Sequence, residues 1–145
     1  MIQPISVYPE AFYRVSVKII IRDGDKVLAV KENVDAWTLP GGGVDHGEVL
    51  DKAIMRELFE ETKITQTPTI KLIGTDTYYR PIEQDWIFWI VAEATFDEPL
   101  TYGIGDDCTA VEFIDPTTLK ESAHRPEQLV YKWSVDPDFE ISKYK

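Results

Sequence analysis

The stretch from Gly42 to Ile64 constrains the fold most, because a glycine-rich segment runs directly into an uninterrupted helical pattern. The triplet Gly41-Gly42-Gly43 allows backbone conformations that other residues rarely adopt, and it lets a ligand approach the main chain. Gly47 and Glu48 are expected to open the helix, with an acid at the positive end of the helix dipole. We therefore predict a glycine loop followed by a helix over residues 49–64.

Three glutamates of this predicted helix share one side of it. Glu57, Glu60 and Glu61 occupy positions i, i+3 and i+4, which at about 100° per residue places them in one arc. Ala53 falls inside this arc and Ile54 at its border, so the acids share a face with apolar residues. Crowded, partly buried carboxylates repel one another and are costly to desolvate, and Mg²⁺ removes both penalties. The three glutamates are therefore candidate metal ligands; chance spacing on a solvated helix is the alternative.

The whole stretch resembles the Nudix box, Gly-x5-Glu-x7-Arg-Glu-U-x-Glu-Glu-x-Gly-U, where U is a bulky apolar residue. One defined position departs from the pattern, because Lys63 stands where the family has its last glycine. A helix end often needs a left-handed residue, which lysine can supply at a cost of about 1 kcal/mol. The positions that match are Gly42, Glu48, Arg56, Glu57, Leu58, Glu60, Glu61 and Ile64.

The resemblance implies a fold and an activity. The expected fold is an α/β/α sandwich with a mixed β-sheet. The expected reaction is hydrolysis of a pyrophosphate linkage in a nucleoside triphosphate, ADP-ribose, nucleotide sugar or similar compound, with Mg²⁺ or Mn²⁺ as cofactor. By resemblance, Glu57, Glu60 and Glu61 hold the metal and Arg56 orients them, while Glu48 supports the loop. Either Glu57 or Glu61 could also act as the catalytic base, and the sequence does not separate them.

Further residues are candidates for substrate binding. Many relatives use an acid from a late loop, where this chain has two adjacent aspartates, although such a pair is more often an ordinary polar loop. A base would need an aromatic platform, and aromatic residues at strand ends or in loops could serve, with core packing as the alternative. The glycine triplet could add a backbone carbonyl. The candidates are Gly41, Gly42, Gly43, Trp37, Tyr78, Asp106 and Asp107.

The rest of the chain alternates between apolar runs and turn residues. The apolar run over residues 86–92 predicts a central strand. The order of elements predicts a mixed sheet with helices on both faces. An irregular arm is expected over residues 1–12 and a tail over residues 135–145. Strands are also expected over residues 15–21, 27–30, 37–40, 70–75 with an extension to 79, and 109–114, and helices from residues 115 and 125.

Length and charge narrow the classes of protein. A chain of 145 residues is expected to form one domain, and its net charge of -11 argues against general binding of nucleic acid or membrane surfaces. A phosphorylated substrate would need a cation in so negative a protein. The chain shows neither a signal-peptide core nor an apolar run of about 18 residues, so we expect a cytoplasmic protein. A homodimer is conceivable, with residues 131–133 and the N-terminal arm as candidate surfaces.

Three other functions compete with hydrolysis. A non-catalytic sensor that binds a nucleotide or metal is slightly favoured by Lys63, whereas the intact glutamates favour the enzyme. An isomerase acting on a prenyl diphosphate would need a catalytic cysteine in a specific motif, and Cys108 is not placed for it. The last alternative is an interaction domain whose acidic helix is incidental.

Overall fold

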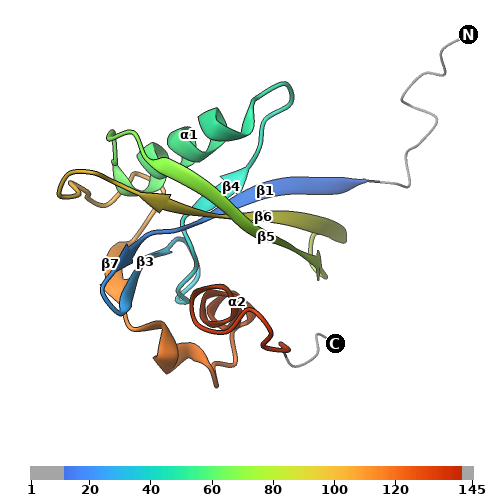
Figure 1. Ribbon diagram of the computed structural model, residues 1–145. Coiled ribbons are helices and arrows are strands. Elements are labelled where there is room, and N and C mark those ends of the chain that lie inside the picture. The colour runs from blue at the N-terminus through green and yellow to red at the C-terminus, as the bar shows by residue number, and fades with distance from the viewer. Residues whose placement is uncertain (1–11, 142–145) are drawn as a thin grey trace, which may run out of the picture.

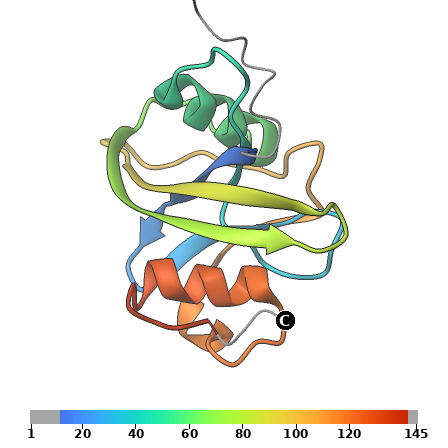
Figure 2. The same cartoon turned by 90° about the vertical axis from the view of Figure 1, so that its right-hand side faces the viewer.

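The computed structural model describes residues 12–141 as two β-sheets between two helices. Figure 1 and Figure 2 show α1 and α2 on opposite sides of the strands. The elements are β1 (Tyr13–Ile20), β2 (Arg22–Asp23), β3 (Lys26–Lys31), β4 (Gly41–Gly43), α1 (Leu50–Thr62), β5 (Thr69–Arg80), β6 (Asp85–Thr95), β7 (Ala110–Ile114), the 3₁₀ helix η2 (Pro116–Leu119) and α2 (Arg125–Ser134).

The larger sheet is mixed, as predicted, and has the order β4-β1-β6-β5. Strand β1 runs parallel to β6 and antiparallel to β4, and the apolar β6 lies inside the sheet as expected. A second, antiparallel sheet has the order β2-β3-β7. The sequence predicted one sheet, but the chain leaves the first sheet at Ile21, whose carbonyl accepts a 2.9 Å hydrogen bond from the Leu28 N–H.

The alternation of side chains along β1 builds a core on each face of the larger sheet. Val17 and Ile19 are buried on the side of α1, where they join Ala53 and Ile54. Ile20 is buried on the opposite side with the apolar residues of α2. Because both faces of β1 are covered toward its end, Val17, Ile19 and Ile20 are all fully buried although their side chains point to different faces.

Helix α2 closes the core on its side of the larger sheet. This contradicts the expectation that residues 131–133 form a dimerisation surface. Tyr131 and Trp133 are buried, and Phe139 packs edge-on against Tyr131 with ring centroids 4.9 Å apart. The region over residues 131–133 is therefore core and not a dimerisation surface. Most of the predicted N-terminal arm, residues 1–11, and the end of the predicted tail, residues 142–145, lie outside the described residues.

Three local predictions were wrong in detail. The glycine triplet forms strand β4 instead of a loop, because β1 supplies hydrogen-bonding partners. Residues 37–40 form only a single bridge, between Thr38 and Val30. Helix α1 begins at Leu50 and not at residues 47–48, because Gly47 (φ 81°) belongs to a turn in which the Glu48 N–H donates to the Asp45 carbonyl.

Among residues 12–141, no helix combines the length and apolarity that a membrane crossing requires.

Candidate active site

Strand β4 holds its backbone close to α1. Gly41 has φ 142° and pairs with Lys18, and a side chain on it would strike the carbonyl of Val17. A Cβ on Gly42 would lie 2.8 Å from both carboxylate oxygens of Glu57. The strand therefore requires glycine at position 41, whereas a side chain at position 42 would displace the carboxylate of Glu57.

Two of the three predicted glutamates are buried between α1 and β4. Glu57 is 8% exposed and Glu61 is 4% exposed, whereas the side chain of Glu60 is 45% exposed. Burial raises the pKa of Glu57, and the guanidinium of Arg56 opposes this effect. The helix thus presents two carboxylates inward and one at the rim, and the predicted shared face is real for the inner pair.

Glu61 is tied to β4 and to a residue that the sequence did not reveal. Its Oε1 accepts a 2.8 Å hydrogen bond from the Gly41 N–H. Burial, and then a hydrogen bond with the carboxyl of Glu32, raise the pKa of Glu61 to about 9. Glu32 follows strand β3 in a polar segment without a motif, so only the three-dimensional fold identifies it as part of the site.

Arg56 connects the loop before α1 to the glutamates. Its Nε and Nη2 donate to the two carboxylate oxygens of Glu48, both at 2.8 Å. Nη2 also donates to the Gly43 carbonyl at 2.9 Å, and Nη1 donates to Glu57 Oε1 at 2.9 Å. The paired guanidinium lowers the pKa of Glu48 to about 2. This network joins the Arg56 guanidinium to Glu57 on one side and to Glu48 on the other. That Arg56 orients the glutamates and that Glu48 supports the loop stay predictions.

The donor set suits a hard divalent cation. Within residues 12–141, no three acidic, histidine or cysteine side chains converge closely enough to form a ready-made metal site. The glutamates instead have other partners: Glu57 and Glu60 share Arg56, and Glu61 accepts from the Gly41 N–H. The two buried carboxylates carry the desolvation cost that a cation would relieve, and oxygen ligands are those that Mg²⁺ prefers.

The end of α1 is closed by Lys63 and a glycine-containing loop. Lys63 adopts the left-handed conformation (φ 59°, ψ 15°), and its N–H donates to the Phe59 carbonyl at 3.0 Å. The N–H of Gly103 donates to the Thr62 carbonyl and that of Gly105 to the Glu61 carbonyl, each at 2.8 Å. These residues belong to the loop between β6 and β7, which we call the late loop. The late loop is thereby attached to the backbone of Glu61 itself.

This loop brings Asp106 and Asp107 to the end of α1. Both are exposed, and neither has a hydrogen bond or an ion pair with another described residue. Cys108 follows them at intermediate exposure, and burial raises the pKa of its thiol to about 12. A thiol that stays protonated is a poor nucleophile. The aspartates are near the site, and their predicted role as a base or additional ligand stays a prediction.

A cavity of about 200 Å³ opens beside Glu32 on the α2 side of the larger sheet. Lys18 lines it, with Nζ 5.2 Å from the ring centroid of Trp89 and 3.3 Å from the Leu39 carbonyl oxygen. Tyr78 stands edge-on to Trp89 at 5.4 Å. Of the two predicted aromatic platforms, Tyr78 therefore lines a cavity next to the glutamates.

Trp37, the other predicted platform, is placed differently. Its ring packs against the α2-side core, with Nζ of Lys31 4.6 Å from its centroid. Its backbone N–H donates to Oε2 of Glu127 at 2.9 Å. Trp37 does not line the cavity, although its neighbours Ala36 and Thr38 do.

Comparisons with known proteins found a family model and relatives that this chain matches. The NUDIX domain family model matches residues 12–133. The chain is 38% identical over 68 residues to a Bacillus subtilis (strain 168) protein named "Putative 8-oxo-dGTP diphosphatase", covering 46% of this chain and 44% of that protein. It is 33% identical over 69 residues to an RNA pyrophosphohydrolase of Vibrio atlanticus (strain LGP32), covering 46% and 40%. These matches span less than half the length of the curated relatives.

A solved structure extends the likeness over most of the chain. The MutT NUDIX hydrolase from Burkholderia pseudomallei superposes with a TM-score of 0.68 at 21% identity, covering 83% of this chain and 97% of that chain. At this level of identity the match concerns the fold alone.

Proposed function

Because the chain belongs to the Nudix family, we propose that it is a divalent-metal-dependent hydrolase that cleaves a pyrophosphate linkage in a nucleoside diphosphate derivative. One observation supports the proposal most strongly. Glu57 and Glu61 are buried carboxylates that face the glycine strand, and Arg56 fixes the first of them. A purely structural helix would place such charges in water, where they cost nothing to solvate.

The proposed metal ligands are Glu57, Glu60 and Glu61, with Mg²⁺ or Mn²⁺ as the cofactor. When bound, the cation would offset the charge of the pyrophosphate and help to activate water. Glu60 lies at the exposed rim, where it would exchange its 3.3 Å ion pair with Arg56 for an incoming cation. Either Glu57 or Glu61 could take the proton from water, since both are buried and both carry a raised pKa.

Positive side chains would position the substrate. Lys18 lies in the cavity on the same strand that pairs with β4, so its ammonium can approach a phosphate next to the glutamates. Arg14 lies against Gly43, where a Cβ would strike its guanidinium. In a chain of net charge -11, these two cations are well placed to attract a polyanion locally.

The cavity bears on the class of substrate. Its volume of about 200 Å³ is below the roughly 300 to 1,000 Å³ that encloses a drug-sized ligand. It is suited to one ring system against Tyr78 and Trp89, with the diphosphate directed toward the glutamates. Nucleoside triphosphates, ADP-ribose and nucleotide sugars all meet this description. The proposed partner is a small nucleotide of this kind.

The proposed location is the cytoplasm. A homodimer remains a prediction that light scattering can test.

A substrate panel with Mg²⁺ tests the proposal. Nucleoside triphosphates, dinucleoside polyphosphates, ADP-ribose, nucleotide sugars and coenzyme A would be incubated with the wild type and Glu61→Gln, and released phosphate or pyrophosphate measured. Glu121→Gln, at an exposed position in a turn, is the matched control. We expect turnover of one class, lost in Glu61→Gln and in EDTA and kept in Glu121→Gln.

The same panel identifies the competing sensor function. Absence of turnover on every compound, together with a nucleotide that still raises the melting temperature, would replace the enzyme by a binding domain. Lys63→Gly would then be the variant to test for recovered activity, because Lys63 is the position at which the motif departs from the family.

A further inference from the structure

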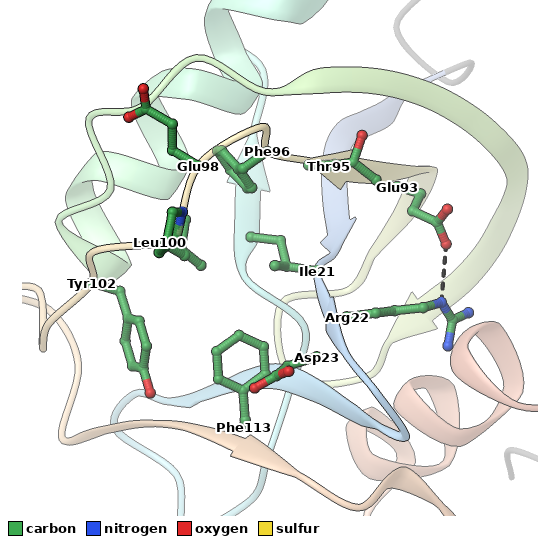
Figure 3. A pocket seen from close by; sticks show the side chains of 12 residues that line it. Ile21, Arg22, Asp23, Glu93, Thr95, Phe96, Glu98, Leu100, Tyr102 and Phe113 are labelled. Atoms are coloured by element: carbon green, nitrogen blue, oxygen red, sulfur yellow. Dashed lines mark hydrogen bonds and ion pairs between the residues drawn. The ribbon is translucent and has the colours of Figure 1, made fainter.

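A second cavity lies away from Glu57 and Glu61, where the two sheets separate. Its volume is about 520 Å³, within the range typical of small-molecule sites. Figure 3 shows Ile21, Phe96, Leu100, Tyr102 and Phe113 around a common space. Tyr102 is 41% exposed and stands edge-on to Phe113 at 5.4 Å, so aromatic surface remains available inside the cavity.

The charges at its rim are unbalanced. The cation Arg22 is already satisfied, because it donates to the Glu93 carboxylate and to the Ser134 carbonyl, both at 3.0 Å. Asp23 and Glu98 also line the cavity, and neither has an ion-pair partner among residues 12–141. An apolar interior with two uncompensated carboxylates at its edge complements a ligand that is apolar at one end and cationic at the other.

We propose that this cavity is a second binding site, which takes a small arylalkyl ammonium compound with its ring against Phe113 and Tyr102 and its cation toward Asp23. The site is separate from the proposed catalytic centre, because none of the residues that line it lines the cavity beside the glutamates. The proposal does not depend on the chain being a hydrolase.

The loop that forms one wall of this cavity also contacts α1. Tyr102 belongs to the loop whose next residue, Gly103, donates to the Thr62 carbonyl, and Gly105 of the same loop donates to the Glu61 carbonyl. A ligand held against Tyr102 restrains this loop, so it stabilises both hydrogen bonds. Occupation of the cavity therefore slows amide exchange at Gly103 and Gly105, next to a proposed metal ligand.

Titration followed by NMR tests the site directly. The wild-type chain would be titrated with 2-phenylethylamine, which is a cation at neutral pH, and with its neutral match 2-phenylethanol. We expect saturable shifts of the Ile21, Tyr102 and Phe113 amides with the amine, binding at least twofold weaker with the alcohol, and slower exchange at Gly103 and Gly105.

Two conservative variants separate a built site from general attraction to a negative protein. Asp23→Asn is expected to weaken amine binding about three- to fivefold, the upper part of the range for an exposed ion pair, and to leave binding of the alcohol unchanged. Asp25→Asn, at an exposed position in the same turn and outside the cavity lining, is the matched control and is expected to bind normally. Equal losses in both variants, shifts centred on Lys18 and Trp89 instead, or no saturable binding would overturn the proposal.

Discussion

Lys63 adopts a conformation that normally belongs to glycine, and its backbone still closes α1 with a 3.0 Å hydrogen bond to Phe59. Gln84 is the other non-glycine residue of positive φ among residues 12–141, and it lies in the turn between β5 and β6, on different elements from the glutamates. These two positions allow the cost of the left-handed conformation to be separated from any effect on the site.

Replacing Lys63 by glycine is expected to stabilise the fold slightly and to leave activity within about twofold. Relief of about 1 to 2 kcal/mol of conformational strain is offset by about 0.5 to 1 kcal/mol of lost glycine entropy, which leaves a net gain of about 0 to 1.5 kcal/mol. Urea unfolding measures it, with Gln84→Gly as the control that should gain a similar amount. A large gain in turnover in Lys63→Gly alone would mean that the lysine distorts the site.

The ion pair of Glu48 and Arg56 predicts a pH dependence. The guanidinium holds the pKa of Glu48 at about 2, below its ordinary value of 4.5. A depressed pKa means that the stabilisation is present above pH 4.5 and is lost as the pH falls from there toward 2. In Glu48→Gln we expect a shallower fall of the free energy of unfolding across this window, measured by urea unfolding. Identical slopes in wild type and variant would contradict the assignment.

At the scale of elements, the backbone of the late loop packs directly against the backbone of α1 at Gly105. A Cβ on Gly105 would lie 2.6 Å from the Glu61 carbonyl carbon and 2.7 Å from its Cα. A Cβ on Gly103 would meet only the Cδ of Lys63, at an ordinary 3.7 Å. Backbone cannot move away as a flexible side chain can, so the two glycines should respond very differently to the same substitution.

Gly105→Ala is expected to destabilise the fold by about 1 to 3 kcal/mol, the usual cost of overpacking, and to raise the Mg²⁺ concentration needed for half-maximal activity. Gly103→Ala should change stability by no more than about 0.5 kcal/mol. Thermal unfolding and a metal titration of each variant check both statements. Equal tolerance of the two alanines would show that the loop does not press on Glu61.

The sequence predicted most elements because their signals are local. The strands at β6 and β3 and the helical turn that starts after residue 115 all depend on neighbouring residues. At that turn, Asp115 accepts a 3.0 Å hydrogen bond from the Thr117 N–H. The pairing of β4 with β1 could not be predicted, since the glycines carry no strand pattern and their partner lies more than 20 residues away.

The candidate site was also predictable only where its signals are local. The spacing within one helix revealed Glu57 and Glu61, and the structure places them together against β4. Glu32 and Lys18 reach the site only through tertiary contacts, so no local pattern identifies them. The division between inner and rim glutamates also depends on how α1 rests on the sheet, which helical periodicity alone does not fix.

At the scale of the whole molecule, a net charge of -11 and two buried carboxylates should make stability depend on divalent cations. A ligand that binds the folded state alone, at 100 times its Kd, adds about 2.7 kcal/mol. We expect Mg²⁺ to raise the melting temperature beyond the effect of NaCl at equal ionic strength, and this excess to disappear in Glu61→Gln but not in Glu121→Gln. An equal effect of the two salts on the wild type would argue against a specific site.

The most direct test of the central claim is a Mg²⁺ titration of hydrolysis, with the substrate that the panel identifies. Wild type, Glu57→Gln, Glu61→Gln and Glu121→Gln would be compared at each metal concentration. The account predicts saturable activation of the wild type and of Glu121→Gln, and a fall of at least about 100-fold in both α1 variants, since even partners of metal ligands are commonly worth 10- to 100-fold. Wild-type turnover without divalent metal, or full activity in Glu57→Gln and Glu61→Gln with the fold intact, would contradict it.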